Sequence, residues 1–122
     1  MDCIFCKIIN GDLPSKKLYE DDQVIAIMDA FPTVEGHVLI IPKIHYSDFT
    51  ELPQEVSIHI QNVATKLTHQ LIEKLKSHSM TFSVNYGTAQ IVKHYHQHLL
   101  PNLHDHKIPE KSVDEIFATI TK

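Results

Sequence analysis

The middle of the sequence carries a single apolar stripe of helical period. Pro53 stands in the first-turn position where a helix tolerates proline. Apolar residues then recur every three or four positions, at Val56, Ile60, Val63, Leu67, Leu71 and Leu75. This spacing places them on one side of a helix. The stripe therefore predicts one long helix that buries one face and exposes the other to water.

The segments on both sides of this helix have the pattern of short strands joined by turns. We expect strands at Lys17–Glu20, Gln23–Asp29, Val38–Ile41, Met80–Asn85 and Ile91–Leu100, and short helices at residues 3–10 and 110–121. This order predicts an α+β fold, with a sheet of about five antiparallel strands covered on one face. A chain of 122 residues with 43% hydrophobic content is long enough for one core, so residues 1–122 are expected to form a single domain.

Charge and hydropathy argue against several classes of partner. The net charge is −4, no arginine is present and no lysine run stands out, so duplex DNA or RNA is not expected as a partner. The longest purely apolar run, Val24–Met28, is far short of the roughly 20 residues that a bilayer requires, so no membrane partner is expected. The first residues lack the pattern of a signal peptide, and two cysteines are too few for a disulfide framework. We expect a cytoplasmic protein with reduced thiols.

Histidine is the unusual component of the sequence. Ten of the 122 residues are histidine, and His94, His96 and His98 alternate within five positions. In a strand these three rings would share a face. Because burying unpartnered polar rings is costly, they must face solvent, bind a metal or take part in catalysis. Catalysis is favoured, since imidazole is nucleophilic and exchanges protons near neutral pH.

The segment His94–Pro101 resembles the signature of the histidine-triad (HIT) family, His-x-His-x-His followed by two apolar residues and often proline. Further segments match the family's Hint-like (bacterial HIT) branch in the same order: Cys3–Gly11, Tyr19–Asp22, Ala26–Asp29, Gly36–His45 and Asn85-x-Gly87. Together the matches extend from residue 3 to residue 101. The resemblance implies a HIT-like fold of five antiparallel strands plus helices, and a homodimer in which two sheets join.

The resemblance also implies a site for an AMP- or GMP-type nucleotide at the triad. His96 would attack the α-phosphorus and form a nucleotidyl-histidine that water hydrolyses, a two-step route that suits a neutral nucleophile. His98 would donate to the phosphate oxygens, and His37 would orient the nucleophile's ring. The remaining implied contacts are Asp29 to the ribose hydroxyls, Asn85, Gly87 and Gln90 to the phosphate, and Phe5, Ile8 and Ile27 to the base.

The sequence departs from the family pattern around the phosphate loop. The stretch from Asn85 to Gln90 is about two residues shorter than in most relatives, and Ala89 replaces the usual glycine. Ile91 stands where a serine or threonine commonly serves the leaving group. Lys93 and Gln97 stand where apolar residues are usual. Nucleotide binding is expected to survive these changes better than the choice of a particular substrate or a high rate of turnover.

Cys3 and Cys6 have the spacing of a metal knuckle. By itself this pair could be redox-active or simply two buried thiols. The resemblance supplies His45 and His94 as two further ligands, and so implies a structural zinc site of four ligands. The alternative is an unmetallated site with free thiols.

Three functions are consistent with these residues. The first is a nucleotide hydrolase of the nucleoside phosphoramidase type, and the second is a dinucleoside polyphosphate hydrolase that uses the same nucleophile. The third is a zinc-stabilised nucleotide-binding or interaction module with little turnover, which the shortened loop favours.

Overall fold

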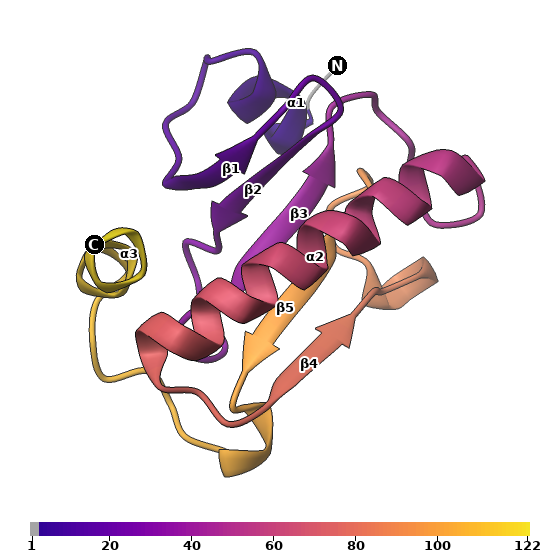
Figure 1. Ribbon diagram of the computed structural model, residues 1–122. Helices are drawn as coiled ribbons and strands as arrows, with labels where there is room; N and C mark the ends of the chain where they lie inside the picture. The colour runs from indigo at the N-terminus through magenta and orange to yellow at the C-terminus, as the bar shows by residue number, and fades with distance from the viewer. Residues whose placement is uncertain (1–2) are drawn as a thin grey trace.

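The computed structural model describes residues 3–122, and Figure 1 shows one long helix crossing a five-stranded sheet. The elements are α1 (Ile4–Ile9), β1 (Lys17–Glu20), β2 (Val24–Met28), β3 (Val38–Pro42), α2 (Gln54–Leu75), β4 (Met80–Ser83), β5 (Gln97–Pro101) and α3 (Val113–Thr121), with 3₁₀ turns η1 (Gly87–Ala89) and η2 (Leu103–Asp105). The strand order is β1-β2-β3-β5-β4, and every neighbouring pair is antiparallel. The predicted α+β fold with one long helix is confirmed.

The two central strands β2 and β3 are covered on both faces. Val24, Ala26 and Met28 point toward α2, whereas Ile25 and Ile27 pack with α1 on the opposite face. All five residues of each strand are buried. The expectation of a sheet covered on one face is therefore wrong for its centre. A continuous apolar run such as Val24–Met28, without polar alternation, is typical of such two-sided burial.

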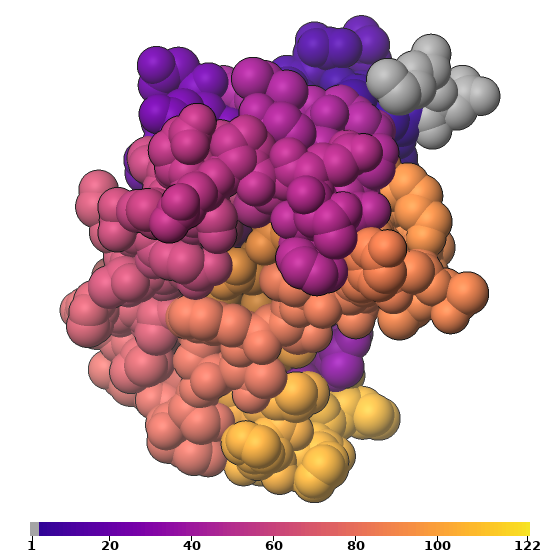
Figure 2. Space-filling view, turned by 90° about the vertical axis from the view of Figure 1, so that its right-hand side faces the viewer, coloured from indigo at the N-terminus to yellow at the C-terminus, as the bar shows by residue number. Residues whose placement is uncertain are grey.

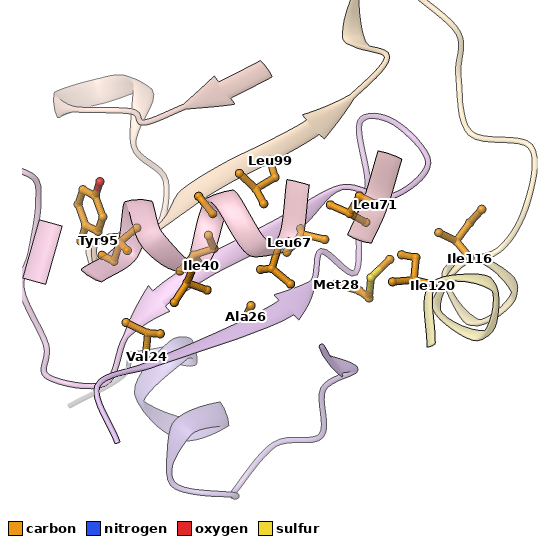
Figure 3. Packing of buried hydrophobic residues seen from close by; sticks show 14 residues of the cluster. Val24, Ala26, Met28, Ile40, Leu67, Leu71, Tyr95, Leu99, Ile116 and Ile120 are labelled. Atoms are coloured by element: carbon orange, nitrogen blue, oxygen red, sulfur yellow. The ribbon is translucent and has the colours of Figure 1, made fainter. Parts of the chain in front are cut away.

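The main core lies between α2 and the sheet, as Figure 3 shows. The predicted stripe supplies Ile60, Val63, Leu67 and Leu71, all buried, and burial of each such side chain contributes roughly 1.5–3 kcal/mol. The helix α3 adds Ile116 and Ile120 at the end of this core. Within residues 3–122, no helix combines the length and hydropathy needed to cross a membrane.

The strand that carries the triad is shorter than predicted. The strand β5 begins at Gln97, so residues 91–96 form an irregular segment and only His98 of the triad lies in a strand. The ladder between β3 and β5 ends at the pair Ile40–Gln97. Pro42 has no N–H to extend it. The backbone N–H of Tyr95 donates instead to the carbonyl of Tyr46, at 2.7 Å.

The turn before β3 depends on a glycine. Gly36 has a φ of +84°, and a Cβ built at this position would lie 2.5 Å from Leu75 Cδ1 and 3.1 Å from Pro101 Cγ. The chain can pass this close to α2 and β5 only because glycine has no side chain. His37 follows directly, so the close packing at Gly36 also fixes the position of the backbone that carries the His37 ring.

Candidate functional site

A cleft of about 760 Å³ lies on the face of the sheet that α1 covers. Its enclosed end is apolar, with Phe5, Ile8 and Ile27 brought together as predicted for a base pocket. Leu39 and Val92, which the sequence did not single out, complete this wall. Asp29 and the rings of His96 and His98 also line the cleft. This size and mix of apolar walls with a few polar groups suits a small-molecule ligand.

His96 has one ring nitrogen fixed by the backbone. Its Nδ1 lies 2.8 Å from the carbonyl oxygen of His94, which can only accept, so Nδ1 carries the proton. The lone pair is therefore on Nε2. The ring packs edge-on against Phe5, with centroids 5.0 Å apart. Burial lowers the pKa of His96, so the ring is neutral near pH 7. His96 is thus a neutral imidazole held in one tautomer, with a lone pair that faces no hydrogen of its own ring.

His98 belongs to a chain of hydrogen bonds that starts at Thr33. The Thr33 backbone N–H donates to His37 Nδ1 at 3.0 Å, so the ring proton of His37 is on Nε2. This N–H donates to His98 Nδ1 at 2.8 Å. His98 therefore carries its own proton on Nε2, which is buried and has no partner among residues 3–122. An unpartnered N–H beside His96 is a donor available to a ligand oxygen.

The position of His37 differs in one respect from the expectation. His37 was expected to orient the nucleophile, yet its hydrogen bonds reach Thr33 and His98, whereas the His94 carbonyl sets the tautomer of His96. Burial lowers the pKa of His37. Burial, with the neighbouring rings of His96 and His37, also lowers the pKa of His98 to about 4. All three rings are therefore neutral near pH 7.

Asp29 lies where β2 ends, at the edge of the cleft. One carboxylate oxygen accepts the backbone N–H of Phe31 at 2.9 Å, and the other lies 3.5 Å from His37 Nε2. This contact fixes the carboxylate next to the histidine chain. A carboxylate in this position can accept hydrogen bonds from ligand hydroxyls.

The predicted phosphate donors are only partly gathered. Asn85 lines the cleft, but Gly87 and Gln90 do not. The side-chain amide of Gln90 is buried and donates to the carbonyls of Ser47 and Val92, at 2.7 and 2.9 Å. Both of its N–H groups are occupied while these bonds last, so Gln90 braces the loop. A phosphate contact from Gln90 or Gly87 stays a prediction.

The four predicted metal ligands are brought together at the far end of the triad. Cys3 Sγ lies 3.3 Å from His94 Nδ1, and Cys6 Sγ lies 3.3 Å from His45 Nδ1 and 3.5 Å from His94 Nδ1. His94 Nε2 donates to the Pro42 carbonyl at 2.8 Å, which leaves its Nδ1 lone pair toward the thiols. In a tetrahedral zinc site, sulfur and nitrogen ligands are about 3.6 Å apart. The set fits a zinc ion.

A second group of candidate ligands, Asp29, His37 and His98, also lies close together. The hydrogen bonds of His37 to Thr33 and His98 disfavour metal binding by this group. A cation would need the lone pair of His37 Nε2, which would move the proton to Nδ1 against the Thr33 N–H. This group is better described as a hydrogen-bonded chain than as a metal site.

Several cleft residues were missed by the sequence reasoning. Lys16, Val113 and Asp114 close one end, because the Lys16 carbonyl pairs with Met28 and its ammonium lies 3.2 Å from Asp114. No local pattern connects β1 with α3, so no signal could have found them. Behind the triad, Gln97 is buried and exchanges hydrogen bonds with Gln61 of α2, at 2.7 and 3.3 Å. Two amides on facing elements explain why a polar residue stands there.

Comparison with known proteins gives consistent matches. Residues 10–112 match the family model described as "HIT domain". The chain is 40% identical over 102 residues to the adenylylsulfatase HINT3 of Arabidopsis thaliana. The match covers 82% of this chain but only about half (52%) of that protein's length. It is 42% identical over 102 residues to an uncharacterized HIT-like protein of Methanocaldococcus jannaschii, covering 81% of this chain and 78% of that one.

Among solved structures, one similar protein is a Zn-bound histidine triad family protein from Mycobacterium smegmatis. The TM-score is 0.89 at 31% identity, over 98% of this chain and 91% of that one. A member of the HIT family of proteins from Bacillus subtilis superposes with a TM-score of 0.81 at 32% identity, over 94% and 86% of the two chains.

Proposed function

This chain belongs to the HIT family, which comprises nucleotide-binding proteins and nucleotide hydrolases, and on that premise we propose that it hydrolyses a purine nucleotide conjugate at the α-phosphate. The proposed substrate is a nucleoside phosphoramidate or a related conjugate. The observation that carries the proposal is the arrangement of two neutral rings, one with a free Nε2 lone pair and the next with a free Nε2–H.

The first step of the proposed reaction is a displacement at phosphorus. The lone pair of His96 Nε2 forms the bond to phosphorus, and the electron pair of the broken P–N or P–O bond leaves with the departing group, which takes a proton from water. The His98 N–H donates to a phosphate oxygen as negative charge develops. Water then attacks phosphorus and releases a proton to solvent. The bond to His96 Nε2 breaks, its electron pair returns to the ring, and a nucleoside monophosphate is released.

The remaining residues of the cleft would hold the nucleoside. Phe5, Ile8 and Ile27 offer an apolar wall for the base, and Asp29 accepts hydrogen bonds from the ribose hydroxyls. Asn85, which also lines the cleft, would contact the phosphate. AMP- or GMP-type nucleotides are therefore the proposed ligands.

We also propose a structural zinc ion on Cys3, Cys6, His45 and His94. The distances among the four ligand atoms support it, as does the similarity to a Zn-bound family member. The metal would tie α1 to the segment that carries His96. The cytoplasmic location expected from the sequence also stays a proposal.

A second candidate function is a nucleotide-binding module with little turnover. It is favoured by one observation, namely that the Gln90 amide is occupied by the loop's own carbonyls and leaves fewer donors for the phosphate.

The test uses adenosine phosphoramidate, diadenosine tetraphosphate and AMP, each with wild type and with His96→Ala. We expect wild type to turn over the phosphoramidate. His96→Ala should abolish this turnover and keep AMP binding within about tenfold, because a missing nucleophile removes transition-state stabilisation and not ground-state binding. The matched control is His104→Ala, a histidine exposed outside the cleft. Equal activity of His96→Ala would overturn the mechanism, and AMP binding without turnover would support the second candidate.

A further inference from the structure

The strand register locates the end of the cleft that lies away from the triad. His98 of β5 pairs with Leu39 of β3, and all of His98, Leu39 and Ile27 line the cleft. Leu39 pairs with Ile27 of β2, which pairs in turn with Lys17 of β1. Because neighbouring strands are about 4.8 Å apart, this row spans roughly 14 Å from His98 to β1. The side of the cleft next to β1 is therefore its far end.

Polar side chains gather at this far end. Ser15 and Lys16 directly precede β1, Asp114 comes from the first turn of α3, and all three line the cleft. The Lys16 ammonium lies 3.2 Å from Asp114 Oδ1, so α3 meets the start of β1 here (Figure 1). The Lys16 carbonyl also accepts the backbone N–H of Met28 at 3.0 Å, which fixes the Lys16 backbone beside β2.

The Ser15 hydroxyl is the observation that points to a ligand. Its oxygen is buried, and it has no hydrogen-bond partner in the part of the chain that the structure describes. A hydroxyl shielded from water without a partner is unfavourable, and a polar ligand atom bonded to it would remove this cost. The side chains of Lys16 and Asp114 are 46% and 78% exposed, so they remain hydrated and can exchange water for a ligand.

We propose that Ser15, Lys16 and Asp114 form a subsite that recognises the polar edge of the base and selects guanine over adenine. The inference rests on the proposed function and specifies its substrate class. With the phosphate at His98 and the base between α1 and Ile27, the edge of the base opposite the ribose faces β1.

The charges of Lys16 and Asp114 match the guanine edge. Guanine presents two adjacent donors, N1–H and the N2 amino group, and beside them the acceptor O6. A carboxylate can accept from both donors and an ammonium can donate to O6, which gives three hydrogen bonds. Adenine has an acceptor at N1, an amino group at position 6 and no polar group at position 2, so the pair can make at most two. The Ser15 hydroxyl both donates and accepts, so it can serve either base.

The test measures the binding of GMP, IMP and AMP to wild type by calorimetry, which requires no turnover. We expect GMP to bind about tenfold more tightly than AMP, the factor that one further hydrogen bond to a charged group produces at a partly exposed site. IMP keeps N1–H and O6 but lacks the N2 amino group, so its affinity should fall between the two. Equal affinity for GMP and AMP, or tighter binding of AMP, would overturn the subsite.

Asp114→Asn tests the carboxylate. An amide presents one acceptor and one donor, the pattern that matches N1 and the amino group of adenine, so the ratio of GMP to AMP affinity should fall to about one or below. The matched control is Asp105→Asn, whose carboxylate lies 3.2 Å from His78 Nε2, outside the cleft. This variant should keep the wild-type ratio. An unchanged ratio in Asp114→Asn would show that the carboxylate does not contact the base.

Ser15→Ala tests the hydroxyl. It should weaken GMP and AMP alike, by about threefold or more, because it removes a hydrogen bond that either base can make. The midpoint of thermal unfolding of each variant shows whether the fold is kept. Unchanged nucleotide affinity in a folded Ser15→Ala variant would exclude Ser15 from the subsite.

A failure of the hydrolase itself gives a different result. If no phosphoramidate is turned over but GMP still binds more tightly than AMP, the subsite is supported in a protein that only binds nucleotides. If adenosine and guanosine phosphoramidates are turned over with equal kcat/KM and the two monophosphates bind equally, the subsite is wrong and the hydrolase stands. If none of the three monophosphates binds, both proposals are wrong.

Discussion

Backbone groups set the tautomers of the three histidines that matter most to the cleft and the metal cluster. The Thr33 N–H fixes His37, the His94 carbonyl fixes His96, and the Pro42 carbonyl fixes His94. Backbone amides do not titrate near neutral pH, so these assignments hold across the working range of a histidine. The sequence could predict that the rings gather, because they alternate. It could not predict their partners, since Pro42 is 52 residues from His94.

The lowered pKa values predict a loss of stability in acid. Because the folded pKa of His98 is about 4 and its ordinary value is 6.5, the unfolded chain takes up this proton first as the pH falls. The contribution to the free energy of unfolding is complete above pH 6.5 and is lost between pH 6.5 and about 4. Urea unfolding of wild type and His98→Asn across this window measures the effect. We expect a shallower pH slope for His98→Asn, and identical slopes would contradict the assignment.

At the level of elements, the alternating histidines correctly predicted which side chains lie on each side of the sheet, but the predicted strand was too long. Tyr95 and Leu99 lie in the core beneath α2, while His94, His96 and His98 lie on the side of the cleft and of α1. This alternation includes residues 94–96, which precede the strand β5. The side-chain period is a local property of the sequence, whereas a strand also needs a paired neighbour, and the ladder between β3 and β5 ends at the pair Ile40–Gln97.

The close approach at Gly36 gives a prediction for the turn before β3. Gly36→Ala adds a Cβ that meets Leu75 and Pro101 and also has to adopt a positive φ. We expect a loss of about 1–3 kcal/mol in the free energy of unfolding. Gly11→Ala is the matched control, because its φ is +86° but nothing lies within 4 Å of the new Cβ. Equal losses in thermal or chemical denaturation would show that only the backbone angle matters.

The proposed zinc site gives a prediction for the attachment of α1. Cys3→Ser should remove the metal and lower the melting temperature, because an ion that binds only the folded chain adds its binding free energy to stability. The chemistry of His96 should remain largely intact, whereas His94→Ala should disturb both metal and turnover. Elemental analysis and thermal unfolding, with and without a chelator, measure this. If freshly prepared, reduced protein contains no zinc, the four-ligand site is wrong and Cys3 and Cys6 are simply packed thiols.

At the scale of the whole molecule, one face remains apolar. The strand β4 pairs only with β5 within the described chain, and Phe49, Phe82, Val84 and Tyr86 are exposed beside it. Figure 2 looks onto this side, where the segments near residues 50 and 85 flank a hollow. An uncovered apolar strand at a sheet edge favours pairing with another chain. That residues 1–122 form a single domain stays a prediction, since the family model covers residues 10–112.

This face supports the homodimer that the family resemblance implies. We expect a species of twice the chain's 14.0 kDa in sedimentation at micromolar concentration. Phe82→Glu should shift it toward the monomer by placing a charge on the edge strand. Ile108→Glu, at an exposed isoleucine that does not line this hollow, should leave it unchanged. A clean wild-type monomer would contradict the homodimer. The sequence could not reveal this face, because Phe49 and Tyr86 meet only after folding, with ring centroids 5.5 Å apart.

The hydrogen bond from the Thr33 backbone N–H to His37 connects this amide to the cleft, although the amide itself does not line it. Its amide hydrogen lies two imidazoles away from any ligand that accepts from His98, yet each link in that series polarises the next. When a ligand oxygen accepts a hydrogen bond from His98 Nε2–H, His98 Nδ1 becomes a stronger acceptor. The bond from His37 Nε2–H is then strengthened, and so is the bond from the Thr33 N–H to His37 Nδ1. The resonance and the exchange rate of the Thr33 amide should then register occupancy of the cleft without any label placed within it.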